Sequence, residues 1–141
     1  MRKIVIAVGG ITLAATLNES PTATKVWEAL PIQAQASTWG DEITFEIPVD
    51  AAQAPDARVL VDVGTLGYWP VGKAFCIFFG PTPASTGSRP QAYSPVTILG
   101  EVTDDATRLR GVRHGASVRI AKAKDAEPLR RMRRMRQRRP A

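Results

Sequence analysis

Residues 64–85 read GTLGYWPVGKAFCIFFGPTPAS and carry the clearest structural signal in the chain. A segment rich in turn residues, with Tyr68 and Trp69, leads into the apolar run Ala74–Phe79. The loop Gly80–Pro95, which has four prolines, follows this run. A short apolar run between turn residues is typical of a buried strand. Because binding groups often lie on loops beside a rigid core strand, we expect any functional site to lie next to this run.

The segments on either side have the alternating pattern of β-strands. Ile32–Ser37 and Ile43–Ile47 alternate apolar and polar residues around a turn, which predicts a hairpin with one buried and one exposed face. Lys3–Val8 and Ile11–Leu17 predict another hairpin, with Gly9-Gly10 as its turn. Three shorter strands are also expected: Val59–Val63, Val96–Leu99 and Ser117–Ile120.

One segment, between residues 21 and 30, has the pattern of a helix. The Ser20 hydroxyl can accept hydrogen bonds from the free N–H groups of the first turn, and Pro21 suits the first helical position. Pro31 ends the segment. Apolar residues recur on one face, at Ala23, Val26, Trp27 and Leu30. We expect this helix to cover a sheet, with Trp27 in the core.

Many short strands with regular turns and one helix predict a mainly β protein, either a barrel or a sandwich, with a helical cap. At 141 residues the chain is most simply one domain. Its charge is uneven, because residues 1–127 hold 12 Lys/Arg and 13 Asp/Glu, whereas residues 128–141 hold 7 Arg and no acidic residue. We therefore divide the chain into a folded domain, residues 1–124, and an arginine-rich tail, residues 125–141.

The dense like charge of the tail predicts a disordered, solvated segment. The alternative is an arm that binds a nucleic acid or an acidic partner with a steep salt dependence. The residues that would bind are Arg130, Arg131, Arg133, Arg134, Arg136, Arg138 and Arg139. The near-neutral body gives no sign of a nucleic-acid surface of its own.

The cysteine and histidine content limits the disulfides and metal sites that the chain can form. Cys76 is the only cysteine and His114 the only histidine, which excludes an intrachain disulfide and a four-ligand Cys/His metal site. We expect no metal, no cofactor and no membrane span, and a cytoplasmic location, which a single free cysteine suits. The first 17 residues also resemble a signal peptide, although their glycine pair and threonines favour the hairpin.

Several short motifs along the chain form a combination that is more specific than any one of them. They are Ser20–Ala23, Val26–Pro31, Thr38–Glu42, Gly67–Pro70, Gly72–Pro83 and Ser94–Val96. This combination, within residues 3–122, resembles the small cyclophilin-like proteins of prokaryotes, a family of domains without an assigned activity. The resemblance implies a closed cyclophilin-like β-barrel of about eight strands with one capping α-helix at about residues 21–30.

Prolyl isomerase activity is the alternative that this resemblance raises, by analogy of fold alone. True prolyl isomerases carry a Phe-His-Arg strand and then a Phe-x-x-Gln-Gly-Gly-Asp segment. Here Phe45-Glu46-Ile47-Pro48 is followed by an alanine-rich loop, so the catalytic arginine and glutamine have no counterpart. The arginine matters because isomerisation needs a donor that favours the twisted amide. We therefore assign no catalytic residue and expect a binding domain rather than an enzyme.

The turns around the apolar run supply the candidate binding residues. Aromatic side chains beside turns can line a shallow groove for a peptide or a small ligand, or can close the ends of a barrel. A lysine in the same place can orient an anionic group or remain solvated. The groove candidates are Trp39, Tyr68, Trp69, Lys73 and Phe75.

Two other arrangements have the residue types for catalysis. Cys76 and His114 could form a nucleophile and base, but apolar residues flank Cys76, and a free cysteine in such a place is usually buried. Glu42 and Glu46 share a strand face and could form an acid–base pair, although such pairs more often mark the wet side of a sheet. We include neither pair in the predicted site.

Overall fold

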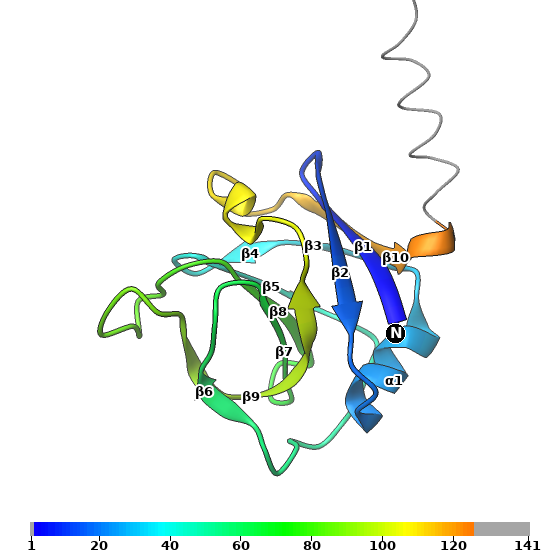
Figure 1. Ribbon diagram of the computed structural model, residues 1–141, viewed down its shortest axis with the longest axis horizontal. Coiled ribbons are helices and arrows are strands. Elements are labelled where there is room, and N and C mark those ends of the chain that lie inside the picture. Colours follow the sequence, from blue (N-terminus) through cyan, green and yellow to red (C-terminus); the bar gives the residue numbers. More distant parts are fainter. Residues whose placement is uncertain (1, 126–141) are drawn as a thin grey trace, which may run out of the picture.

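The computed structural model describes residues 2–125 (Figure 1). These residues form ten strands, the α-helix α1, the 3-10 helix η1 and, directly after the last strand, a helical segment over residues 123–125. In chain order the elements are β1 (Arg2–Val8), β2 (Ile11–Leu17), α1 (Pro21–Ala29), β3 (Ile32–Gln35), β4 (Ser37–Thr38), β5 (Glu42–Glu46), β6 (Arg58–Leu60), β7 (Thr65–Trp69), β8 (Ala74–Phe78), β9 (Gln91–Val102), η1 (Ala106–Leu109) and β10 (Ser117–Lys122).

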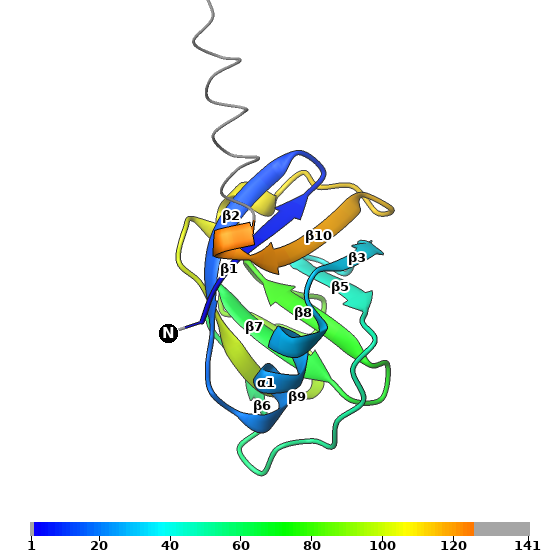
Figure 2. The same ribbon diagram turned by 90° about the vertical axis from the view of Figure 1, so that its right-hand side faces the viewer.

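The strands form one strongly curved sheet that wraps into a barrel (Figures 1 and 2). Its hydrogen-bonded order is β3-β10-β1-β2-β9-β7-β8-β5-β4, and β6 pairs with β9 beside this path. The mainly β prediction is confirmed, but two details differ. The strands outnumber the predicted eight, and within residues 2–125 no ladder joins β3 to β4, so hydrogen bonds do not close the sheet. The chain itself joins these two edges, since only Ala36 separates β3 from β4.

The predicted hairpin near the start of the chain is confirmed. β1 and β2 pair in antiparallel register from Arg2 with Leu17 to Val8 with Ile11. The turn is the Gly9-Gly10 pair, whose φ angles are 54° and 91°. Glycine adopts such positive angles without the steric cost that other residues incur, which explains the pair at this position.

The other predicted hairpin, residues 32–47, forms only in part. β4 pairs with β5 through two residues, whereas β3 pairs with β10. Ala36 shows why, because its N–H donates to the Ala116 carbonyl at 2.8 Å and its carbonyl accepts from the Gly115 N–H at 2.7 Å. The chain therefore stays beside the β10 end of the molecule until Ala36 and only then turns toward β5.

The loop predicted over Gly80–Pro95 is shorter in the structure, because its last five residues belong to β9. The strand already begins at Gln91, so the predicted strand Val96–Leu99 is only its middle. Pro95 has no N–H to donate, yet it lies within the strand. It falls where the pairing of β9 with β6 shifts register, between Gln91 and Val96. Proline is tolerated at such irregularities because the regular ladder is already interrupted there.

The predicted helix is confirmed as α1. The Ser20 hydroxyl accepts from the Ala23 N–H at 3.2 Å, as a cap should. Ala23 and Val26 are fully buried in the main core. Trp27 packs against the same core while remaining partly exposed, and the Lys122 amine lies 4.7 Å from its ring centroid. No helix in residues 2–125 is both long and apolar enough to cross a membrane.

The apolar run at the centre of the sequence is a strand buried on both faces, β8. Phe75 and Ile77 belong to the main core inside the barrel. Cys76 and Phe78 belong to a second apolar cluster, on the opposite face of the strand. The members of this outer cluster are Val61, Ala74, Cys76, Phe78, Ala92 and Val96. The start of β9 thus covers part of the outer face of the barrel, and the candidate site lies at the margin of that cover.

Candidate functional site

A pocket of about 380 Å³ opens on the outer face of the barrel, over β5 and β8. Residues from β4, β5, β7, β8 and the first half of β9 line it, together with the β4–β5 and β7–β8 turns. The lining residues are Ser37, Trp39, Glu42, Thr44, Phe45, Glu46, Trp69, Gly72, Ala74, Cys76, Ala92, Tyr93, Ser94 and Val96. Most of this surface is apolar or aromatic, with a few polar groups among them, as is usual for small-ligand sites.

Strand register explains which side chains form the floor of the pocket. Thr44 pairs with Cys76 and Glu46 pairs with Ala74 across β5 and β8. Paired residues in antiparallel strands project from the same face of a sheet. Ile43 and Phe45 alternate with these residues and lie in the barrel core. The polar residues of β5 therefore line the pocket, and Phe45, which belongs to the barrel core, also borders it.

Three aromatic rings form the walls. The ring centroid of Tyr93 lies 6.2 Å from that of Trp39 and 6.3 Å from that of Trp69, with interplanar angles of 80° and 78°. Tyr93 thus stands nearly perpendicular to both indoles, which is a favourable edge-to-face geometry. The Trp69 indole N–H donates to the Ser94 hydroxyl at 2.6 Å, which fixes that ring against the first half of β9. Tyr93 itself is 78% exposed, so the walls stand open to solvent.

Glycine makes room for one of these walls. A Cβ atom on Gly72 would lie 2.9 Å from a ring carbon of Trp69. The absence of a side chain at this position lets the indole pack closely against the β7–β8 turn.

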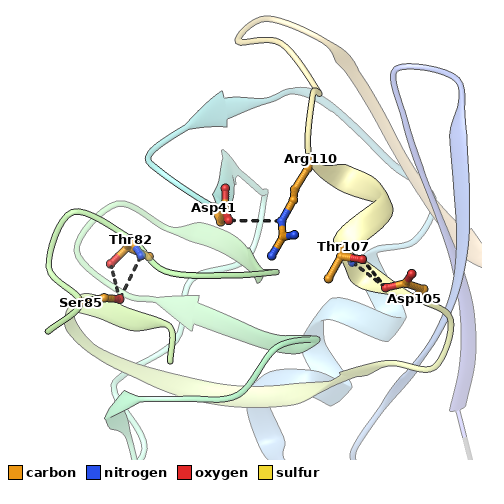
Figure 3. Close-up of polar contacts among 6 residues, drawn as sticks. All are labelled: Asp41, Thr82, Ser85, Asp105, Thr107 and Arg110. Carbon is orange, nitrogen blue, oxygen red and sulfur yellow. Dashed lines mark hydrogen bonds and ion pairs between the residues drawn. The ribbon is translucent and has the colours of Figure 1, made fainter. Parts of the chain in front are cut away.

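An ion pair holds the β4–β5 turn, which carries Trp39. The guanidinium of Arg110, just after η1, pairs with the Asp41 carboxylate, with Nε 3.5 Å from Oδ2 (Figure 3). At the start of η1, the Asp105 carboxylate caps the helix by accepting from the Thr107 N–H at 3.0 Å (Figure 3). The backbone of Asp41 also bonds to the segment after β8, because its N–H donates to the Pro81 carbonyl at 3.0 Å. The turn is therefore anchored on two sides.

The loop that leads into β9 is held by its own hydroxyl groups. The Thr82 N–H donates to the Ser85 hydroxyl at 2.9 Å (Figure 3). The Ser85 hydroxyl in turn donates to the Arg89 carbonyl at 2.9 Å. The Thr82 hydroxyl donates to the Gln91 carbonyl at 2.5 Å, which ties the loop to the first residue of β9. These bonds support the segment that carries Tyr93.

Glu42 is a buried carboxyl group at this pocket. Only 5% of its surface is exposed, and within the described residues its Oε1 atom has no hydrogen-bond partner. Burial raises the pKa of Glu42 from its ordinary value of 4.5 to about 7, an effect that the neighbouring Cys76 thiol partly opposes. The carboxyl can thus change its charge near neutral pH. Glu46, which we grouped with it, is exposed.

Cys76 lacks the surroundings of a nucleophile. It is 1% exposed, and burial, followed by the negative charge of Glu42, raises the pKa of its thiol. A thiol with a raised pKa stays protonated at neutral pH and is a poor nucleophile. His114 lies exposed in the loop before β10. The ionisable neighbour of Cys76 is Glu42, whose charge opposes thiolate formation.

The structure separates the predicted groove residues into three groups. Trp39 and Trp69 line the pocket together. Tyr68 and Phe75 lie fully buried inside the barrel, where the Tyr68 hydroxyl donates to the Val49 carbonyl at 2.6 Å. Strand alternation explains this, because Tyr68 pairs with Phe75 on the inner face. Lys73 lines a separate hollow, and its amine lies 4.0 Å from the Asp50 carboxylate.

Tyr93 and Ser94 are pocket residues that the sequence analysis missed. They lie in the predicted loop Gly80–Pro95, whose prolines mask the start of β9. The signal that could have identified them is the Tyr93-Ser94-Pro95 sequence directly before a β-rich run, which is compatible with a strand that begins earlier.

A family model described as cyclophilin-like matches residues 2–121. The chain belongs to the cyclophilin-like family. This cyclophilin-like barrel is similar to the solution structure of the hypothetical protein AF2241 from Archaeoglobus fulgidus, with 32% sequence identity, a TM-score of 0.74, and coverage of 86% of this chain and 95% of that chain. No curated protein matches the cyclophilin-like chain in sequence.

One of our predictions falls on residues that the structure does not describe. The arginine-rich tail beyond residue 125, including Arg130 to Arg139, lies outside the described part of this cyclophilin-like chain. Within residues 2–125, no group of three or more His, Cys, Asp or Glu side chains could hold a metal ion.

Proposed function

We propose that this cyclophilin-like domain is a binding module that takes a small molecule or part of a peptide in the pocket over β5 and β8. The observation that supports the proposal is the pocket itself, about 380 Å³ in volume, with aromatic walls and a buried carboxyl group. Pockets of this size and composition are typical of ligand sites. The walls are held by the Trp69–Ser94 hydrogen bond and the Asp41–Arg110 ion pair, so the site is largely preformed.

Prolyl isomerase activity has less support. The reaction requires a donor close to the substrate amide, and within residues 2–125 no arginine lines the pocket. Two nearby arginines have other partners. The guanidinium of Arg89 donates to the Val61 carbonyl at 2.9 Å and pairs with Asp62, and Arg110 pairs with Asp41.

The three tryptophans provide a direct test of the binding proposal. Trp39 and Trp69 line the pocket, while Trp27 lies on α1 and serves as an internal control. In a screen of peptides and small molecules by ¹H–¹⁵N chemical-shift mapping, genuine ligands should shift the indole N–H signals of Trp39 and Trp69 and leave that of Trp27 in place. Ligands that shift only residues remote from the pocket, such as those around His114, would refute the site.

The tail supports a separate proposal, that its arginines bind a nucleic acid or an acidic partner. The supporting observation is seven arginines without an acidic residue in residues 128–141. Such binding should weaken steeply as the salt concentration rises.

A further inference from the structure

We propose that the pocket binds an ammonium group that keeps at least one N–H, as in an alkylamine or a lysine side chain. This inference rests on the proposed function and names the chemical class of its ligand. Three features of the pocket support it: the buried carboxyl group, the sign of the surrounding charges, and the aromatic walls.

The first feature is the carboxyl group of Glu42. It lines the pocket, is 5% exposed, and has one oxygen, Oε1, with no partner in the described chain. Burial of an ionised carboxylate is costly unless a cation or several hydrogen-bond donors compensate it. The only polar neighbour from β8 is the Cys76 thiol, a weak donor. A ligand in the pocket that brings a positive charge and an N–H would compensate the charge of this carboxyl group.

The second feature is the sign of the charges around the pocket. Within residues 2–125, the lining contains two carboxyl groups, Glu42 and Glu46, and no lysine, arginine or histidine. The nearby cations have other partners, because the Lys73 amine lies 4.0 Å from Asp50 and Arg110 lies 3.5 Å from Asp41. Such a site disfavours an anion and favours a cation.

The third feature is the arrangement of Trp39, Trp69 and Tyr93. The face of an aromatic ring carries partial negative charge and attracts a cation within about 6 Å of its centroid. Tyr93 stands nearly perpendicular to both indoles, so the three rings present surfaces in different directions around one opening. Open aromatic walls of this kind suit the CH₂ or methyl groups next to a charged nitrogen.

The combination of walls and carboxyl group selects among cations. A quaternary ammonium can contact the rings but has no N–H to donate to Glu42. A primary ammonium, or one with one or two methyl groups, can do both. The alternative is that the pocket binds a neutral ligand, whose carbonyl accepts a hydrogen bond from protonated Glu42. Such a ligand would not interact favourably with the second carboxyl group, that of Glu46.

The experiment measures the affinity of the full chain for three matched probes, butylammonium, butyltrimethylammonium and 1-butanol, by chemical-shift titration. Butylammonium should bind more tightly than 1-butanol by on the order of tenfold to a hundredfold, the effect of a hydrogen bond to a charged group. Butyltrimethylammonium should lie between the two. In the Glu42→Gln variant, the affinity for butylammonium should fall to the affinity for 1-butanol.

Glu28→Gln is the matched control, because Glu28 is exposed on α1 and outside the pocket. It should leave the affinity for butylammonium unchanged, and the amide spectrum of each variant checks that it is folded. Since glutamine can still donate to a carbonyl, a site for neutral ligands would keep its affinity in Glu42→Gln. An unchanged butylammonium affinity in this variant therefore refutes the inference.

A second series identifies the source of the ammonium group. Acetyl-lysine-N-methylamide that binds more tightly than butylammonium supports a polypeptide ligand, and the reverse order supports a free amine. If 1-butanol and butylammonium shift the Trp39 and Trp69 signals with equal affinity, the pocket binds ligands but our inference is wrong. If no probe shifts these signals, the inference fails, and the broader ligand screen decides the proposed function separately.

Discussion

Glu42 is a carboxyl group that the fold removes from water, and among residues 2–125 one of its oxygens has no hydrogen-bond partner. Its pKa of about 7 in the folded chain, against 4.5 ordinarily, makes folding depend on pH. Below about pH 4.5 the group is protonated in both states. As the pH rises further, the unfolded chain releases this proton first and is favoured, so the free energy of unfolding falls by up to about 3 kcal/mol before it levels off above about pH 7.

Glu42→Gln should remove this dependence, since glutamine has no proton to release. Urea unfolding between pH 4.5 and 8 should show the variant gaining stability relative to the parent chain as the pH rises. Glu28→Gln changes the same atoms on an exposed surface and should follow the parent throughout. If the free energies of unfolding of Glu42→Gln and the parent chain change with pH in parallel, the carboxyl of Glu42 is better solvated than its surroundings indicate.

The same residue shows how far the site could be predicted. Aromatic residues beside turns made Trp39 and Trp69 groove candidates, and both line the same pocket in the structure. Their role in binding stays a prediction. Alternation with Ile43 placed Glu42 on the outer face, which the sequence analysis treated as wet. What covers that face is the segment Ala92–Val96, about fifty residues away in the sequence. Local periodicity assigns a face to a side chain but does not tell what lies over that face.

At the level of elements, the contact between the β4–β5 turn and the segment after β8 leaves no space for a side chain at Gly80. A Cβ atom there would lie 2.2 Å from Oδ2 and 2.9 Å from Cβ of Asp41. Gly80→Ala should therefore displace Asp41, weaken its pairing with Arg110 and lower the free energy of unfolding by about 1–3 kcal/mol. Thermal unfolding measures this change.

Gly87→Ala is the control for this prediction. Gly87 belongs to the same loop, and a Cβ atom there would meet no atom within 4 Å. The variant should unfold at the temperature of the parent chain. Equal unfolding temperatures for both alanine variants would mean that the turn can move away from the loop at little cost.

The elements that the sequence predicts well are those with local signals. The glycine pair between β1 and β2 and the serine cap of α1 are read from neighbouring residues, and both are confirmed. The partner of β3 and the start of β9 depend on contacts between distant segments. β3 pairs with β10, more than 80 residues later. β9 begins inside a proline-rich stretch, which a strand tolerates there because the pairing of β9 with β6 is irregular. A strand pattern does not specify its partner.

For the whole molecule, the described fold ends near the last strand. β10 ends at Lys122, and the cyclophilin-like match ends at residue 121. Deletion of residues 128–141 should therefore change the free energy of unfolding by less than about 0.5 kcal/mol, as measured by urea denaturation. It should abolish any salt-dependent binding to nucleic acid. A clear loss of stability would assign these residues a role in the fold, and retained binding would refute the tail proposal.

The unclosed sheet has a consequence for behaviour at high concentration. Its outermost strands are β3, β4 and β6, with only four, two and three residues. Unpaired strand edges are templates on which other chains can add and start fibrils, and short edges limit this growth. The chain also passes directly from one end of the sheet to the other through Ala36. Short edge strands therefore limit strand-by-strand aggregation of this barrel, although hydrogen bonds do not close the sheet within the described residues.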